Sequence, residues 1–252
     1  TAILHGVDLA LDAGQMHGLV GETGSGKSMT ARAIVGLLPP GGRVTAGSAT
    51  FGDQDLLAKT EAEMREVRGA AIGMIFQNPR TALYPMLNIE QQMSNVIKSH
   101  LDLDKAERVA RVREHLGLVG IDDVDRVAKA YPHELSGGMA QRAVIAMALV
   151  CGPSLLIADE PTTGLDATIQ RQILELIRSL QDQLTLSVLI ITHDLGVVAQ
   201  YCDTVSVMTE GRVVEDGAVR SVLLEPAEEY TKKLIAASDL GDIRKKRLAA
   251  QQ

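Results

Sequence analysis

The sequence predicts an α/β fold built on a mainly parallel β-sheet. Short apolar runs, which are typical of buried strands, alternate with longer segments of helical periodicity. A glycine-rich loop, GETGSGKS at 21–28, joins one buried run to a helix. Residues 90–130 interrupt the alternation, because they lack strand patterning and contain helical spacing. We therefore expect one domain of 252 residues with a helical segment inserted between its strands.

The N-terminal part of the chain predicts strands that alternate with helices. Apolar residues alternate with polar ones from Ile3 to Leu11, and Gly14 follows as a turn. A buried run leads into the glycine loop, and the helix after the loop is stopped at 39–42 by two prolines and two glycines. The expected strands lie at 3–11, 16–20, 47–51 and 71–77, and the expected helices lie at 27–38 and 60–68.

The α/β alternation resumes after the helical insertion. Within the insertion, Val109, Val112, Leu116 and Val119 share one helical face, with charged residues between them. Parallel strands that follow one another through helices require right-handed crossovers. The expected strands lie at 155–158, 188–192, 204–209 and 212–216, and the expected helices lie at 136–150, 167–183 and 195–202.

The composition excludes several classes of protein. The net charge of −7 argues against a dedicated nucleic-acid binder, which normally carries a basic face. Cys151 and Cys202 are too few for a disulfide framework, so we expect buried free thiols in a reducing compartment. No apolar stretch approaches the roughly 20 residues that span a bilayer. No basic and apolar signal segment precedes the first strand. Any role at a membrane is therefore expected to come through a partner.

The loop at 21–28 matches the phosphate-binding pattern G-x-x-x-x-G-K-[ST]. A random chain of this length matches that pattern about one time in a hundred, given ordinary residue usage. Glycines let the backbone N–H groups turn inward to phosphate, and the helix adds its positive end. Lys27 would contact the β- and γ-phosphates, and Ser28 would offer its hydroxyl to Mg²⁺. The predicted nucleotide-binding residues are Gly21, Glu22, Thr23, Gly24, Ser25, Gly26, Lys27 and Ser28.

Two acids end the buried run LLIADE at 155–160. They fall at the carboxyl edge of the sheet, where ligands of open α/β sheets bind. Asp159 suits the role of Mg²⁺ ligand, acting mainly through the water shell of the ion. Glu160 suits the general base that activates the attacking water. Alone, the two acids could instead cap the next turn, and the phosphate loop in the same chain favours catalysis.

Three further polar residues end strands or begin helices, and each is weak evidence by itself. Gln77 follows a predicted strand, as does His193, and such residues are commonly solvated or structural. Asp166 precedes a predicted helix and is typical of an N-cap. All three belong to loops that suit one edge of the sheet.

The octapeptide LSGGMAQR at 135–142 specifies the family. Ser136, Gly137 and Gly138 open a helix whose backbone N–H groups form an anion site. Taken in order with the phosphate loop, Gln77, the two acids, the GLD tripeptide at 164–166 and His193, the octapeptide resembles ATP-binding cassette (ABC) ATPases. This resemblance extends over the whole chain.

The resemblance implies a role for each of these residues. Gln77 would see Mg²⁺ and the attacking water, and His193 would contact the γ-phosphate. Asp166 would lie at a dimer interface. Residues Ser136, Gly137, Gly138 and Gln141 would complete the ATP site of a second, head-to-tail cassette, which could be a copy or a paralogue. ATP and Mg²⁺ are the implied cofactors.

The resemblance also implies a P-loop NTPase (RecA-like) core with a mainly parallel sheet, a small antiparallel β part and an inserted helical subdomain. We expect the core at 1–77 and 153–224, the helical subdomain at 78–152, and a C-terminal helix with a basic tail at 225–252. The family normally has one more strand, carrying an aromatic residue that stacks on adenine. Nothing before Thr1 supplies it, so we expect that strand to be missing from this sequence.

Finer features resemble ATPases of the peptide and nickel importer group. These are MIFQNPRTALYP at 74–85, YPHELSGGMAQR at 131–142, DEPTTGLDATIQ at 159–170 and PAEEYTKKLIAA at 226–237. The group implies a peripheral subunit on the cytoplasmic face of the plasma membrane. Its partners would be integral membrane permease subunits and, indirectly, an extracytoplasmic solute-binding protein.

Other functions are compatible with parts of the sequence. An ABC ATPase could instead serve a soluble enzyme assembly, such as one for phosphonate breakdown. DNA-repair and translation ABC proteins need a long coiled-coil insertion or tandem cassettes, and this chain has neither. A kinase or GTPase of another family would leave 135–142 unexplained.

Overall fold

The computed structural model describes residues 2–238, and these divide into two compact units. Of the described residues, the first unit comprises 2–58 and 187–238, and the second comprises 59–186. The helical subdomain that we expect at 78–152 falls inside the second unit, and its boundaries stay a prediction. The expected basic tail after Gly241 lies outside the described residues.

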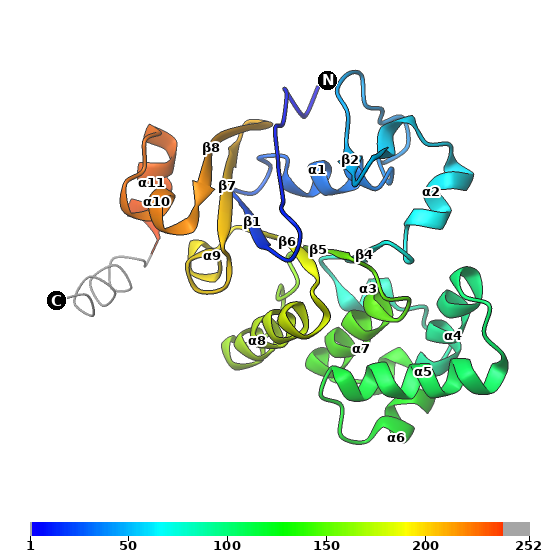
Figure 1. The fold of residues 1–252 in the computed structure, drawn as a ribbon. Helices are drawn as coiled ribbons and strands as arrows, with labels where there is room; N and C mark the ends of the chain where they lie inside the picture. The colour runs from blue at the N-terminus through cyan, green and yellow to red at the C-terminus, as the bar shows by residue number, and fades with distance from the viewer. Residues whose placement is uncertain (1, 239–252) are drawn as a thin grey trace. The chain divides into compact units, whose positions relative to one another are not determined.

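The sheet of the first unit is mainly parallel, as predicted. Its strand order is β6-β1-β7-β8, and β1 runs parallel to both of its neighbours. The last pair, β7 and β8, is an antiparallel hairpin (Figure 1). Its register is irregular between Val207 and Met208. Every residue of β1 is buried, as expected for a strand with a parallel neighbour on each side. The strands are β1 (Met16–Val20), β6 (Ser187–Thr192), β7 (Thr204–Thr209) and β8 (Arg212–Ala218).

Helices and a small antiparallel pair complete the first unit. Val20 of β1 belongs to a buried apolar cluster with residues of the helices on that side of the sheet, such as Val198 and Ile235. The antiparallel pair, β2 (Thr50–Phe51) and β3 (Gln54–Asp55), confirms the predicted small antiparallel part. The helices are α1 (Lys27–Ile34), η1 (Leu56–Ala58), α9 (Leu195–Tyr201), α10 (Val219–Leu224) and α11 (Glu229–Ala237).

Two expectations for the N-terminal part are wrong. Residues 3–11 form no strand, because Gly6 is in the left-handed region at φ 86°, and Ile3 is 51% exposed. The segment is tied down by a bond from the His5 N–H to the Gly211 carbonyl at 2.8 Å. Helix α1 ends at Ile34 rather than near residue 38, because the left-handed Gly36, at φ 67°, stops it.

The second unit holds a parallel strand pair and most of the helices. Strands β4 (Ile72–Ile75) and β5 (Leu155–Asp159) pair in parallel register. Helix α5 contacts α4, α6 and α7, which confirms a helical insertion between these two strands. The helices are α2 (Glu61–Val67), α3 (Pro79–Ala82), α4 (Ile89–His100), α5 (Lys105–Leu118), α6 (Val124–Lys129), η2 (Pro132–Glu134), α7 (Gly137–Leu149) and α8 (Ala167–Leu184).

Local sequence explains where these helices begin. Thr60, Asn88 and Asp104 each form a capping box, in which the cap side chain and the third helical residue bond each other's backbone. Such a box satisfies two donors that the first turn would otherwise leave unpaired. The starts of α2 and of two helices of the insertion, α4 and α5, are therefore encoded locally.

The described residues include both cysteines and the helices that could be tested for membrane-spanning length. Within residues 2–238, no helix is long and apolar enough to cross a membrane. Cys151 and Cys202 are free thiols and half-buried rather than fully buried. Burial raises the pKa of the Cys151 thiol, which keeps it protonated near neutral pH.

Candidate functional site

The phosphate loop connects β1 to α1 and requires glycine at defined positions. Gly26 precedes α1 at φ 106°, and a Cβ there would lie 2.8 Å from Leu4 Cδ2 and 2.9 Å from Met208 Cε. A Cβ on Gly21 would lie 2.0 Å from the Met208 carbonyl oxygen. The Gly211 N–H donates to the Ser25 carbonyl at 2.9 Å and holds the loop against the β7–β8 turn. These close approaches leave no room for a side chain at Gly21 or Gly26, so the loop requires glycine at both positions.

The ammonium of Lys27 lies inside this loop. Its Nζ donates to the Gly21 carbonyl at 2.7 Å and to the Glu22 carbonyl at 2.8 Å, and the residue is 5% exposed. The N-cap of α1, Gly26, forms no side-chain hydrogen bond to the first turn, and Lys27 is the first residue of the helix. A positive helix end beside a lysine charge is an arrangement that favours an anion.

Glu160 lies directly after β5, with its backbone in the left-handed region at φ 48°. Its Oε2 atom accepts hydrogen bonds from Gln77 Nε2 and from Thr163 Oγ1, each at 2.8 Å. A non-glycine residue in this conformation costs about 1–3 kcal/mol and commonly marks a functional site. Two donors fix the carboxylate of Glu160, so it is oriented before any water binds.

Thr163 was not predicted from the sequence. Its only signal is a hydroxyl three residues after an acid, in a segment that resembles an ordinary turn. Gln77 follows β4, which ends at Ile75, and its amide nitrogen bonds Glu160. The structure therefore joins Gln77 and Glu160, which are 83 positions apart in sequence.

Asp159 and His193 end strands, as predicted. Asp159 is the last residue of β5 and is 2% exposed. His193 follows β6, is exposed, and stands between Thr192 and the N-cap of α9, Asp194. Asp194 Oδ1 accepts the Gly196 N–H at 2.6 Å, and the Thr192 hydroxyl oxygen accepts the Asp194 N–H at 3.0 Å. These bonds fix the backbone on both sides of His193.

The signature helix α7 begins at the predicted residues. Ser136 is its N-cap, and the hydroxyl oxygen accepts the Met139 N–H at 3.3 Å. A Cβ on Gly137 would lie 3.2 Å from Leu165 Cδ2, and one on Gly138 would lie 3.0 Å from Ile169 Cγ2. The two glycines therefore let α7 begin close to the start of α8.

Two other predicted residues, Asp166 and Gln141, have positions in the isolated chain that do not depend on a nucleotide. Asp166 caps α8, because its Oδ1 accepts the N–H groups of Thr168 and Ile169 at 3.1 Å each. Gln141 is 1% exposed, and neither its amide nitrogen nor its amide oxygen has a hydrogen-bond partner. A nucleotide could touch Gln141 only after the residue became exposed.

The predicted magnesium ligands have suitable donor atoms. Mg²⁺ takes oxygen ligands and keeps several waters. The Ser28 hydroxyl and the Asp159 carboxylate are donors of this type, and the amide oxygen of Gln77 is another. Within the described residues, no group of three or more His, Cys, Asp or Glu side chains could hold a metal ion. The fit to Mg²⁺ therefore rests on donor chemistry.

The chain is similar to known ATP-binding proteins along most of its length. The dipeptide transport ATP-binding protein DppD of Bacillus subtilis is 48% identical over 235 residues, which are 93% of this chain and 70% of that protein. The oligopeptide transport ATP-binding protein OppD of the same organism is 48% identical over 93% of this chain and 66% of its own length.

A solved structure agrees with the fold. The dimeric ATP-binding cassette MJ0796, in a post-hydrolysis state bound to ADP and Pi, matches with a TM-score of 0.76 and 27% sequence identity. The match covers 86% of this chain and 91% of that one. The family model of the ABC transporter matches residues 4–163. The chain therefore belongs to the ABC transporter family, as an ATP-binding subunit that hydrolyses ATP.

Proposed function

We propose that this chain powers the uptake of peptides through separate membrane subunits. The proposal is supported by relatives at 48% identity that are named as dipeptide and oligopeptide transport proteins. The inserted helical subdomain, at 78–152, would dock the integral membrane permease subunits. An extracytoplasmic solute-binding protein would deliver the peptide, and the ATPase would lie on the cytoplasmic face of the membrane. No nucleic acid takes part.

The working unit is a head-to-tail dimer with a second cassette. The observation that carries this proposal is the presence of two phosphate-binding helix starts in one chain, at α1 and at α7. One ATP would lie between the phosphate loop of one chain and the residues Ser136, Gly137 and Gly138 of the other. Asp166 would lie at the interface, and Gln141 would join the site only if closure exposed it. The dimeric state of the similar cassette MJ0796 is consistent with this arrangement.

Each site residue has a defined task in hydrolysis. The backbone of Gly21–Ser28 and the Lys27 ammonium bind the phosphates and balance their charge. Glu160 accepts the proton of the attacking water, since Gln77 and Thr163 already orient its carboxylate. His193 donates to the γ-phosphate and stabilises the charge that develops there.

Mg²⁺ would be held by Ser28, Asp159 and Gln77 together with the phosphates. When bound, the ion neutralises charge on the β- and γ-phosphate oxygens. Binding of ATP favours the closed dimer by its differential affinity for the two states, and hydrolysis returns the dimer to the open state.

Transport by cells tests the substrate and the role together. Cells lacking this gene, complemented with wild type or with Glu160→Gln, would be supplied with a labelled dipeptide or oligopeptide. We expect uptake with wild type and none with the variant, and co-purification of both with membrane subunits. Equal uptake by both strains, or co-purification with a soluble enzyme assembly alone, would refute the proposal.

A further inference from the structure

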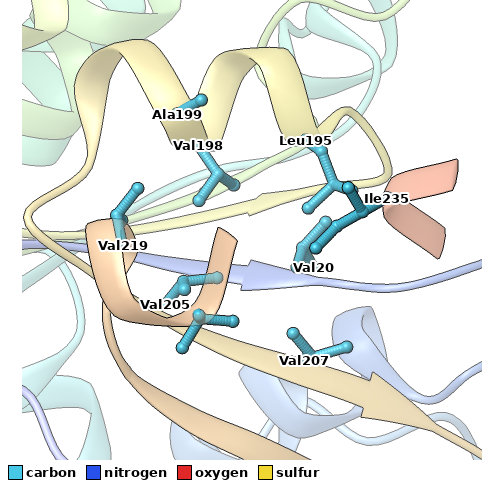
Figure 2. Close-up of a cluster of buried hydrophobic side chains, with 9 residues drawn as sticks. Val20, Leu195, Val198, Ala199, Val205, Val207, Val219 and Ile235 are labelled. Carbon is cyan, nitrogen blue, oxygen red and sulfur yellow. The ribbon is translucent and has the colours of Figure 1, made fainter. Parts of the chain in front are cut away.

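The C-terminal helix α11 is packed against the parts of the first unit that carry the phosphate loop. Ile235 of α11 belongs to the same buried cluster as Val20, the last residue of β1, and Leu195, the first residue of α9 (Figure 2). Val20 directly precedes Gly21, where the phosphate loop begins. The helix therefore rests on the strand end from which the loop emerges.

A carboxylate on β8 fixes the start of this helix. Glu215 accepts the N–H groups of Ala227, at 2.7 Å, and of Glu228, at 3.2 Å. Burial alone would raise the pKa of Glu215, but hydrogen bonds, including these two, hold it below its usual value. The charged form of Glu215 therefore anchors the segment that leads into α11 near neutral pH.

One side chain of α11 reaches the phosphate loop. The hydroxyl oxygen of Tyr230 accepts the Glu22 N–H at 3.3 Å, and the ring of Tyr230 packs against the buried cluster. The Glu22 N–H and the Gly21 carbonyl belong to the same peptide group. In a trans peptide these two bonds point in opposite directions. The Gly21 carbonyl accepts the Lys27 ammonium on the other side, at 2.7 Å.

The peptide between Gly21 and Glu22 is thus held at both ends. Rotation of this peptide would break the bond to Tyr230 and would also withdraw the carbonyl from Lys27. The Lys27 ammonium has a second partner in the loop, the Glu22 carbonyl at 2.8 Å, so its position depends on the same turn. A change at the Tyr230 hydroxyl is therefore transmitted to the lysine through one rigid group.

We propose that Tyr230 is a positioning residue for ATP binding, which acts through the Gly21–Glu22 peptide to place the Lys27 ammonium for the phosphates. The C-terminal helix then has a part in nucleotide affinity although it carries none of the predicted site residues. The inference rests on the ATP site described above. It assigns to this chain a contact between elements 208 positions apart in sequence.

The test is the affinity of the full-length subunit for fluorescent ATP and AMP analogues, measured by titration with wild type and Tyr230→Phe. The variant removes the hydroxyl and keeps the ring, so the core packing is retained. We expect a threefold to tenfold weaker affinity for ATP, about the effect of one uncharged hydrogen bond. The affinity for AMP, which lacks the β- and γ-phosphates, should stay within a factor of about two, close to experimental error.

Three variants separate a role of Tyr230 in positioning Lys27 from a general destabilisation of the first unit. In a Lys27→Ala background, Tyr230→Phe should have no further effect on ATP affinity. Glu215→Gln weakens the anchor of α11 and should lower ATP affinity in the same direction. Tyr201→Phe removes a hydroxyl from α9 in the same unit and serves as the matched control, with unchanged affinity.

Several outcomes would overturn the inference. The first is an unchanged ATP affinity in Tyr230→Phe, and the second is an equal loss of affinity for ATP and for AMP. The third is a loss of ATP affinity on Tyr230→Phe that is as large in the Lys27→Ala background as in the wild type. Failure of the wild type itself to bind ATP would instead overturn the assignment of the ATP site, and the inference with it.

Discussion

The starts of α1 and α7 are built from similar residues but are completed differently. Helix α1 follows the left-handed Gly26, and no side chain caps its first turn. Helix α7 follows Ser136, whose hydroxyl accepts the Met139 N–H at 3.3 Å. The first start carries the Lys27 ammonium, whereas the first turn of α7, Gly137–Ala140, has no charged side chain. One start has its own cation, and the other offers only neutral donors.

This difference indicates a division of tasks. A helix start with an ammonium group can bind an anion by itself, because the charge and the N–H groups act together. A neutral start, already capped by its own serine, can only add to the binding of an anion that is held elsewhere. The chain therefore suits an arrangement in which α1 binds ATP first and α7 closes on the ATP of a second chain.

The largest expected effect comes from Glu160→Gln. The amide cannot accept the proton of the attacking water, so hydrolysis should fall by about 10²- to 10⁴-fold. Affinity for ATP should be unchanged, because the anion site at α1 is intact. Single-turnover hydrolysis and size-exclusion chromatography with ATP should show a slow enzyme and a trapped dimer. Hydrolysis at the wild-type rate would remove Glu160 from the role of base.

Ser136→Arg tests the second helix start alone. The large cation removes the cap and blocks the N–H groups, and hydrolysis should fall by about 10²- to 10³-fold, as when donors to a transition state are lost. Binding of ATP by the isolated chain should be unaffected. Ser99→Arg, at an exposed position on α4, is the matched control and should hydrolyse normally. A parallel loss of binding in Ser136→Arg would contradict the division of tasks.

Alanine substitutions at Gly26, before α1, and at Gly138, in α7, should affect the two helix starts differently, because the two glycines have different backbone conformations. Gly26→Ala places a side chain at φ 106° and within 2.9 Å of Leu4 and Met208, and should weaken ATP binding by about tenfold to a hundredfold. Gly138→Ala lies inside a helix, and its Cβ would meet one side chain, at the γ2 methyl of Ile169, at 3.0 Å. It should leave binding unchanged and reduce hydrolysis a few-fold. Equal effects on binding would contradict the comparison.

The smallest effect is expected from a substitution at Gln141, which lies in α7 after its first turn. Replacing the buried amide by methionine removes two polar atoms without partners and should stabilise the chain by about 1–3 kcal/mol. Thermal unfolding measures the gain. The rate of hydrolysis, measured alongside, decides the role of the side chain: a normal rate excludes Gln141 from the nucleotide site, and a reduced rate requires that closure exposes it.

The sequence predicted the elements whose signals are local. The buried runs became β1, β5, β6 and β7, and the loop, the signature start and the two acids lie where strand and helix ends were expected. The strand predicted at 3–11 was wrong, because an alternating pattern forms a strand only where a neighbouring strand pairs with it. In addition, Gly6 bends the backbone there.

Two contacts could not be predicted, because each depends on the backbone conformation or packing of the folded chain. Thr163 supports Glu160 only because the backbone turns at φ 48° after β5. Tyr230 reaches Glu22 because α11 packs on the strand end before the phosphate loop. The first contact needs the left-handed backbone at Glu160, and the second needs α11 to pack on a distant strand end, so neither is predicted by the sequence pattern.

The central claim is that the two helix starts of one chain act on different ATP molecules. Complementation between Lys27→Ala and Ser136→Arg tests it most directly, with Glu160→Gln used first to establish that the chain dimerises in ATP. Each variant alone should be inactive, and a mixture should regain hydrolysis, because one site of the mixed dimer has an intact loop facing an intact Ser136. A mixture as inactive as its components, in a chain that does dimerise, would contradict the claim.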